Sequence, residues 1–575
     1  MKKLLKYMRG YGKECVLGPL FKLLEATFEL FIPLVVAAIV DTGIAGGDRG
    51  YILKMCLVMV GLGVIGLICA VTAQYFAAGA AVGFAVRLRH AVMEHILSLS
   101  YGQIDTLGSA TLVTRMTSDI NQVQNGVNLT LRLLLRSPFV VFGAMVMAFT
   151  IDAQAALIFL GLIAVLCLVV FGVMLITMPM YKNVQAGLDR VTSATRENLA
   201  GVRVLRAFCM EESQTDFFRG LTQALNLKQL RAGGISALMN PLTFVIVNLA
   251  VVVLVNTGAW KVEGGVLSQG LVIALYNYMS QILVELVKMA NLIISMTKAA
   301  ACAGRVASVL EIPCDQVDGE RNADGLRGQV EFCNVTARYP GAAEASLEHI
   351  SFTAKPGQTI GIIGGTGSGK TTLINLIPRL YDAAEGQVLI DGTDVREYRM
   401  EQLRQKIGIV PQKAVLFKGT IRKNLLWGNE NATDEELWAA LNLAQAREVV
   451  KDKEGELDAP VAQGGVNFSG GQRQRLTIAR ALVRKPAILI LDDSASALDY
   501  ATDAALRSAI RGMENPPTTF IVSQRAASVR YADKILVLDE GELVGLGTHA
   551  ELLENCPVYQ EIYHSQFPRE VTDNG

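Results

Sequence analysis

The sequence predicts an α-helical membrane domain followed by a soluble α/β domain. Hydrophobic residues make up 51% of the 575 residues and charged residues only 18%, and the mean hydropathy is +0.35, which is too apolar for a soluble protein of this length. The long apolar runs lie between about residues 14 and 300, and the sequence after about residue 310 has a mixed composition. A glycine-rich turn between an expected strand and an expected helix lies in that second part. We therefore expect a membrane domain at 1–310, a linker at 311–328 and an α/β domain at 329–575.

The composition argues against several classes of partner and site. The formal net charge is zero, so nothing indicates a nucleic acid or an acidic surface as a partner. The nine cysteines form no CxxC pair and no zinc pattern, so we expect neither a zinc site nor a disulfide framework. We interpret them as reduced thiols and small apolar side chains.

The N-terminal segment resembles the start of a signal peptide, because Met1–Lys6 is basic. The apolar segment after it covers about 16–40, contains Lys22, Glu25 and Glu29, and has no small-residue cleavage site. We therefore interpret it as the first membrane helix, preceded at residues 1–10 by a short interfacial helix.

Crossing a bilayer takes roughly 20 largely apolar residues. The candidate spans, of which the third is short, lie at about 16–40, 52–80, 137–151, 155–178, 239–260 and 267–294. The loops at about 81–136 and 179–238 are long and basic, so the positive-inside rule places them and both termini in the cytosol. These loops contain little Gly or Pro and show helical apolar spacing, which predicts that the membrane helices continue into the cytosol.

Ionisable residues inside membrane spans are costly and are therefore often functional. The candidates for contact with a transported molecule are Glu25, Glu29, Tyr276, Asn277, Tyr278 and Glu285. The alternative is that these side chains face a water-filled vestibule or lie in the cytosolic extension and contact no cargo.

The segment 364–371 fits the phosphate-binding pattern GxxxxGK[ST]. A buried strand is expected before it and a helix after it, so its backbone N–H groups and the helix N-terminus can surround phosphate groups. Lys370 would place a positive charge on the terminal phosphates, and the Thr371 hydroxyl would bind Mg²⁺. The residues expected to bind ATP here are Gly364, Gly365, Thr366, Gly367, Ser368, Gly369, Lys370, Thr371 and Thr372.

A second part of the nucleotide site is expected at the end of the strand 488–491. Asp492 follows this apolar strand, and the carboxyl ends of parallel strands meet at the same sheet edge. Its carboxylate would therefore lie beside the phosphate-binding loop and hold Mg²⁺ through water.

The segment 467–476, which contains Ser469, Gly470, Gly471 and Gln472, resembles the LSGGQ signature of the ABC superfamily. In that family the signature contacts the γ-phosphate of ATP bound to the opposite subunit. The resemblance implies further roles: Tyr339 stacks on adenine, Gln412 contacts Mg²⁺ and the membrane domain, and Asp499 belongs to the D-loop. The turns near 100–106 and 208–215 resemble the coupling helices of this family.

The resemblance covers the whole chain and implies a bacterial ABC exporter half-transporter in the plasma membrane, with six transmembrane helices fused to a P-loop ABC ATPase domain. Two catalytic positions depart from the family pattern. Asp493 stands where the family has its general base, a Glu, and one methylene less withdraws the carboxylate by roughly 1 Å. Gln524 stands where the family has a His, and a neutral amide cannot carry its proton or charge. Gln463 is a weaker departure.

Both departures lie on the Walker side, whereas the signature side is intact. A homodimer would contain two impaired ATP sites, whereas a heterodimer would contain one impaired site and one site completed by Ser469–Gln472. This asymmetry resembles the degenerate-site subunit of bacterial heterodimeric multidrug exporters, and we expect a second, non-identical half-transporter as partner. The expected cargo is an amphiphilic drug, lipid or peptide. The alternatives are a homodimer in which Asp493 still hydrolyses ATP, a siderophore-type importer on the exporter fold, and a ligand-sensing protein that transports nothing.

Overall fold

The computed structural model describes residues 2–494 and 496–567, so residue 1 and residues 568–575, at the ends of the two expected domains, lie outside the described residues. The chain divides into two compact units. The membrane unit is Met1–Leu97 with Ala110–Ile312, and the α/β unit is Ser98–Ser109 with Pro313–Gly575. Each unit has hydrophobic clusters of its own.

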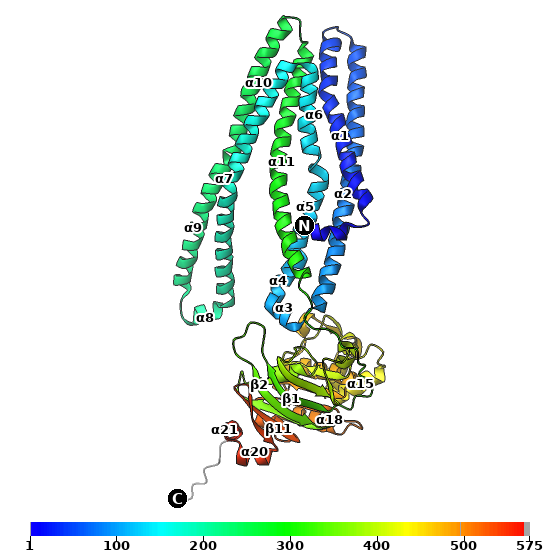
Figure 1. Ribbon diagram of the computed structural model, residues 1–575, viewed down its shortest axis with the longest axis vertical. Coiled ribbons are helices and arrows are strands. Elements are labelled where there is room, and N and C mark those ends of the chain that lie inside the picture. Colours follow the sequence, from blue (N-terminus) through cyan, green and yellow to red (C-terminus); the bar gives the residue numbers. More distant parts are fainter. Residues whose placement is uncertain (1, 495, 568–575) are drawn as a thin grey trace. The chain divides into compact units, whose positions relative to one another are not determined.

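The membrane unit is entirely helical over the residues that the structure describes (Figure 1). Its elements are η1 (Lys2–Met8), α1 (Gly12–Ala38), η2 (Ile39–Ile44), α2 (Arg49–Ser98), α4 (Ser109–Thr114), η3 (Arg115–Asp119), α5 (Ile120–Leu133), α6 (Arg136–Ile151), α7 (Ala153–Ala200), α8 (Val202–Ala207), α9 (Glu211–Ala237), α10 (Met239–Glu263) and α11 (Gln269–Leu310).

Six continuous helical stretches in residues 2–494 and 496–567 are long and apolar enough to cross a membrane. They are Gly12–Ile44, Arg49–Ser98, Ser109–Ile151, Ala153–Ala200, Glu211–Glu263 and Gln269–Leu310. The predicted helical membrane domain is therefore confirmed. The last helix begins two residues later than the predicted span, because Ser268 caps it by accepting a hydrogen bond from the N–H of Leu271.

Small residues bring the membrane helices close together. A Cβ atom on Gly126 of α5 would lie 2.2 Å from the Cβ of Ala299 of α11, so only glycine fits between these two helices. Gly18 of α1 lies against the backbone of Ala73 and Ala77 of α2, which are almost completely buried. Such close approach is how helices gain packing energy in lipid, where apolar side chains gain little from leaving the solvent.

Arg136, at the start of α6, connects three membrane helices. Its Nη1 donates a hydrogen bond to Glu285 Oε1 of α11 over 2.6 Å, and its Nη2 donates to Glu29 Oε2 of α1 over 2.6 Å. Ser137 Oγ donates to Glu285 Oε2 over 2.8 Å, and Lys288 Nζ donates to Glu285 Oε1, the oxygen that Arg136 also binds, over 2.9 Å. Arg136 and Glu285 are 7% and 3% exposed, so this charge cluster is buried within the unit.

The candidate cargo residues therefore have different surroundings. Glu285 is bound on both carboxylate oxygens by protein groups, and Tyr278 is buried and donates its hydroxyl to the carbonyl oxygen of Leu30 over 2.6 Å. Glu29 is only partly buried, with 38% of its side chain exposed, and Tyr276 is 46% exposed. Glu285 and Tyr278 thus stabilise the helix packing, whereas Glu29 and Tyr276 keep exposed surface.

The α/β unit contains two principal sheets. Its strands are β1 (Val330–Ala337), β2 (Leu347–Ala354), β3 (Thr359–Gly364), β4 (Glu385–Ile390), β5 (Thr393–Asp394), β6 (Ile407–Val410), β7 (Gly419–Thr420), β8 (Pro460–Val461), β9 (Ile488–Asp492), β10 (Thr518–Val522), β11 (Lys534–Asp539) and β12 (Glu542–Gly547). The larger sheet has the order β12-β11-β3-β10-β9-β6, and its pairs are parallel except at β12. The smaller, antiparallel sheet has the order β2-β1-β4-β5.

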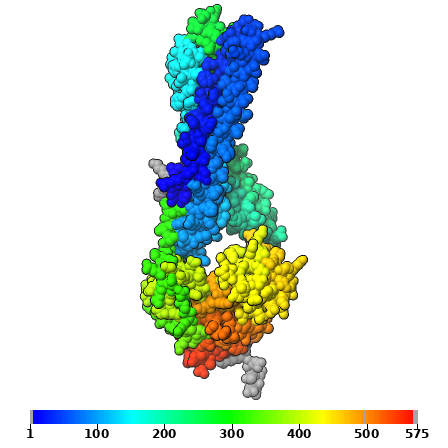
Figure 2. All heavy atoms as spheres, turned by 90° about the vertical axis from the view of Figure 1, so that its right-hand side faces the viewer, coloured from blue at the N-terminus to red at the C-terminus, as the bar shows by residue number. Residues whose placement is uncertain are grey.

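The helices of this unit are α3 (Tyr101–Leu107), α12 (Lys370–Leu376), α13 (Met400–Gln405), α14 (Ile421–Leu425), α15 (Asp434–Leu443), α16 (Arg447–Lys451), η4 (Glu456–Asp458), η5 (Gln463–Gly465), α17 (Gly470–Val483), α18 (Tyr500–Arg511), α19 (Ala526–Val529), α20 (His549–Asn555) and α21 (Pro557–Gln566). Figure 2 shows the segment from about 420 to 460 as a lobe (yellow) apart from the strands of the antiparallel sheet (green). The predicted α/β fold is confirmed.

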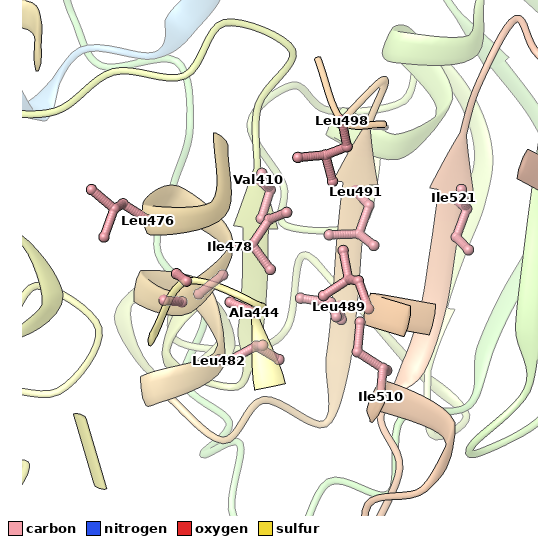
Figure 3. Packing of buried hydrophobic residues seen from close by; sticks show 14 of the residues in the cluster. Val410, Ala444, Leu476, Ile478, Leu482, Leu489, Leu491, Leu498, Ile510 and Ile521 are labelled. Carbon is pink, nitrogen blue, oxygen red and sulfur yellow. The ribbon is translucent and has the colours of Figure 1, made fainter. Parts of the chain in front are cut away.

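The central strands of the large sheet are buried on both faces. All five residues of β9 and of β10 are buried, as expected for parallel strands covered by helices. On one face, Leu489 and Leu491 of β9 pack in a hydrophobic cluster with Ile478 of α17 and Ile510 of α18 (Figure 3). This core fixes the register of β3, β9 and β10 relative to one another. It therefore also fixes the positions of the residues that follow the carboxyl ends of these strands.

Replacing Arg136 should destabilise the membrane unit, because Glu285 and Glu29 would lose their buried partner. We expect Arg136→Met to cost about 3–5 kcal/mol, the usual cost of breaking a buried ion pair, and to lower the thermal unfolding temperature in detergent. The matched control is Arg219→Met. Arg219 pairs with Asp216, and both side chains are about two-thirds exposed, so this variant should unfold at the wild-type temperature. Equal unfolding temperatures for both variants would contradict the role assigned to Arg136.

Candidate functional site

The loop between β3 and α12 is shaped by glycine. Gly367 and Gly369 have φ values of +84° and +92°, a region that residues with a side chain rarely adopt. A Cβ atom on Gly369 would also lie 2.6 Å from the carbonyl oxygen of Ser346, so no larger residue fits there. The chain can therefore turn tightly into α12 with the first N–H groups of that helix unpaired, as phosphate binding requires.

Lys370, the first residue of α12, is 9% exposed. Among the described residues, its Nζ donates hydrogen bonds to the carbonyl oxygens of Gly364 (2.9 Å) and Gly365 and to Ser368 Oγ (3.3 Å), all of them neutral. Burial lowers the pKa of Lys370, while the nearby carboxylates of Asp492 and Asp493 act in the opposite direction. A buried ammonium group without a hydrogen-bonded carboxylate fits a site that receives an anion.

Asp492 and Thr371 meet beside this loop. Asp492 ends β9 and is 6% exposed, and the Thr371 hydroxyl lies 3.3 and 3.4 Å from its two carboxylate oxygens. Burial raises the pKa of Asp492, and the charge of Asp493 adds to this effect. A hydroxyl and a desolvated carboxylate at this spacing are oxygen ligands of the kind that Mg²⁺ prefers, so the residues present fit this ion.

The two departures from the family pattern lie at the same cavity. Asp493 adopts a left-handed conformation with φ of 44°, and its N–H donates to the carbonyl oxygen of Val522 over 2.9 Å. Its Oδ2 accepts a hydrogen bond of 3.4 Å from Gln412 Nε2. Gln524 follows β10 and is exposed. The structure therefore places Gln412, Asp493 and Gln524 at one cavity.

The cavity has a volume of about 340 Å³. It is lined by Tyr339, Ser346, Thr366, Gly367, Ser368, Gly369, Lys370, Thr371, Thr372, Gln412, Asp492, Asp493, Val522, Ser523 and Gln524. Gly364 and Gly365 do not line it, and their carbonyl oxygens instead hold Lys370. Ser346, Val522 and Ser523 were not predicted, since no motif marks them.

Tyr339 reaches the cavity from the end of β1. Its hydroxyl lies 3.0 Å from Thr372 Oγ1, and its ring lies edge-on to that of Tyr381 at 5.1 Å. Tyr381 in turn donates its hydroxyl to Asp105 Oδ2 of α3 over 2.7 Å. Sequence reasoning missed Tyr381, which joins α3, one of the turns that resembles a coupling helix, to the residue expected to stack on adenine.

The signature residues do not line this cavity. Ser469 is exposed and caps α17: its Oγ accepts the N–H of Gln472, while Gln472 Oε1 accepts the N–H of Ser469. Gly471 lies close to the carbonyl oxygen of Ala497, and Gly470 has open space around it. Asp499 caps α18, and the backbone N–H of Thr502 lowers the pKa of its carboxyl group. None of these residues is among those that line the cavity.

Comparison with known proteins agrees with this arrangement. Residues 15–286 match the family model described as ABC transporter transmembrane region, and residues 347–496 match the model described as ABC transporter. An ABC transporter ATP-binding protein of Mycobacterium tuberculosis is 39% identical over 569 residues, covering 98% of this chain and 97% of its own.

Two further relatives span nearly the whole chain. The ABC transporter ATP-binding protein YfiB of Bacillus subtilis is 36% identical over 574 residues, covering 100% of both chains. The ATP-dependent lipid A-core flippase of Escherichia coli is 28% identical over 546 residues, covering 95% of this chain and 94% of its own. With its helical membrane unit and its nucleotide cavity in one polypeptide, this chain belongs to the ABC transporter family.

Proposed function

We propose that this chain is a subunit of an ATP-driven exporter that moves amphiphilic molecules out across a bacterial plasma membrane. The observation that carries this proposal is the cavity in which Lys370, Thr371 and Asp492 meet, in a chain with six apolar helices. The similarity to a protein named as a lipid flippase supports lipids or lipid-like molecules as the cargo class. Of the candidate cargo residues, Glu29 and Tyr276 keep exposed surface that such a molecule could contact.

Different residues of the cavity would bind the phosphates, the Mg²⁺ ion and the adenine of ATP. Lys370 would exchange its neutral oxygen partners for the terminal phosphates, a gain for a buried cation. Thr371 and Asp492 would hold Mg²⁺, together with Gln412, and the ion would neutralise phosphate charge. Tyr339 would stack on the adenine, a contact worth roughly 1–3 kcal/mol.

This cavity is proposed to hydrolyse ATP slowly. Asp493 is shorter than the glutamate of the family, and its side chain is further engaged by Gln412. A carboxylate withdrawn by about 1 Å can cost about a hundredfold in rate. Gln524 contributes an amide where the family has an imidazole, so it offers a hydrogen bond without a charge.

The separation of the signature from the cavity supports assembly of two chains. Exposed Ser469 and Gly470 present the start of α17 outward, where only another molecule can use it. We propose a non-identical half-transporter as that molecule, because a second copy would bring a second Asp493 and a second Gln524. The proposed heterodimer then contains one slow site and one site with an intact signature from this chain.

Restoring the family residues should raise ATP hydrolysis. We expect the double variant Asp493→Glu with Gln524→His to increase steady-state ATPase activity of the purified chain about tenfold to a hundredfold, because the carboxylate reaches further and an imidazole faces the terminal phosphate. The single variants, assayed beside it, should each give a smaller increase. Wild-type activity in the double variant would remove the basis for a slow site.

Removing the charge of Asp492 should stabilise the ligand-free protein and abolish Mg²⁺-dependent nucleotide binding. Because burial raises the pKa of Asp492, the folded state disfavours its charged form at neutral pH. We expect Asp492→Asn to raise the unfolding temperature of the α/β unit at neutral pH, and this difference should shrink as the pH falls from the raised pKa toward the ordinary pKa of an aspartate.

The control for that experiment is Asp503→Asn. Asp503 is another buried acid of the same unit with a raised pKa. It pairs with Arg507 at 3.1 Å, and neither residue lines the cavity. This variant should leave Mg²⁺-dependent nucleotide binding intact. Mg²⁺-dependent binding by Asp492→Asn at wild-type affinity would contradict the metal role of Asp492.

The proposed assembly is tested by transport in vesicles. We expect the chain alone to show little uptake of a fluorescent phospholipid analogue into inside-out vesicles. Co-expression with a half-transporter that carries Glu and His at the positions of Asp493 and Gln524 should give ATP-dependent uptake. Brisk ATP turnover and uptake by the chain alone would instead establish an active homodimer.

A further inference from the structure

The last described helix, α21, holds the loop that carries Gln524. The side-chain amide of Gln566, at the end of α21, makes two hydrogen bonds to the backbone of this loop. Its Nε2 donates to the carbonyl oxygen of Gln524 over 2.8 Å, and its Oε1 accepts from the N–H of Ala526 over 2.8 Å. We call this pair of contacts the Gln566 bridge.

The helix that carries the bridge is firmly fixed to the core. Tyr559 of α21 is 0% exposed, and its hydroxyl lies 2.8 Å from His549 Nδ1 of α20. Ile562 and Tyr563 pack on the same hydrophobic cluster. The spacing of residues 559, 562, 563 and 566 places all four on one helix face, so the packing of buried Tyr559 and of the partly buried Ile562 and Tyr563 directs Gln566 toward the loop.

This contact gives the N–H of Ala526, in the loop, a hydrogen-bond acceptor. Helix α19 begins at Ala526 without a cap from the side chain of Arg525, the residue before it. The N–H of Arg525 is bound by Ser523 Oγ at 3.0 Å, and the next N–H, that of Ala526, is bound by Gln566. A helix N-terminus requires acceptors for its first N–H groups. Gln566, from a distant part of the chain, thus supplies one of these acceptors.

We propose that Gln566 is a positioning residue for nucleotide recognition: by holding the backbone at the carbonyl oxygen of Gln524 and at the N–H of Ala526, it keeps the Gln524 side chain at the cavity. Gln524 lines the cavity from the same loop whose carbonyl oxygen Gln566 holds. This inference rests on the proposed contact of Gln524 with the terminal phosphate. Its consequence is that discrimination between ATP and ADP depends on α21, outside the cavity.

The test compares two glutamines of the same helix in the full-length chain. Gln560 also donates its amide to backbone carbonyl oxygens, but to those of Leu553 and Glu554 at the end of α20. We expect Gln566→Met to weaken binding of Mg²⁺ with the non-hydrolysable analogue AMP-PNP about threefold to tenfold, the loss expected for one hydrogen bond. Binding of ADP should change less than about twofold, and Gln560→Met should change neither.

A double-mutant cycle tests whether Gln566 affects AMP-PNP binding through residue 524. If Gln566 acts through residue 524, Gln524→Ala combined with Gln566→Met should bind AMP-PNP no more weakly than Gln524→Ala alone. Additive losses, equal losses for AMP-PNP and ADP, or the same effect from Gln560→Met would each overturn the inference. If Gln524→Ala weakens AMP-PNP and Gln566→Met does not, only the positioning role fails. If Gln524→Ala has no effect, the proposed role of Gln524 fails as well.

Amide hydrogen exchange separates positioning from folding. In Gln566→Met the N–H of Ala526 should exchange faster, while the unfolding temperature stays at the wild-type value. Should that variant fail to fold, Gln566→Glu retains the acceptor for Ala526 and loses the donor for the Gln524 carbonyl oxygen. It should then show an intermediate loss of AMP-PNP binding, and wild-type binding by this variant would exclude the bridge to residue 524.

Discussion

The nucleotide cavity depends on the parallel alignment of β3, β10 and β9. In this register Ile362 lies beside Val522, and Val522 lies beside Asp492, so the residues after all three strands emerge at one edge. The phosphate-binding loop follows the first strand, Gln524 follows the second by two residues, and Asp492 ends the third. Because these strands are buried on both faces, a shift of one strand would expose apolar side chains and separate the cavity residues.

In the membrane unit, the pairing of buried charges determines how the helices pack. Charges in an apolar environment must be paired, and Arg136 supplies the central cation for carboxylates from two other helices. Lys22 pairs with Glu25 at 2.5 Å in the same region, and Lys288 reinforces Glu285. Paired charges fix which helices lie side by side, a choice that apolar packing alone leaves open in lipid.

The sequence predicted the features that are local in the chain. The apolar spans and the fold class follow from composition over tens of residues, and the glycine loop, Asp492 and Ser469 follow from short motifs beside a strand or a helix. Features that join distant segments could not be predicted: Arg136 and Glu285 are 149 positions apart, and no pattern links Gln566 to Gln524 or Tyr381 to Asp105.

The pairing of Asp152 with Lys261 has a mechanical consequence. Asp152 caps α7, and both of its carboxylate oxygens accept hydrogen bonds from Lys261 of α10, at 2.7 and 2.6 Å. Further along α7, Gly187 lies against Leu225 of α9. These contacts pack α7 against α9 and α10, and α7 alone, with 48 residues, is about 72 Å long. A tilt of α7 by about 5° at its Asp152 end would therefore displace α8 by roughly 6 Å. Small rearrangements near Asp152 thus produce larger displacements at the α8 end.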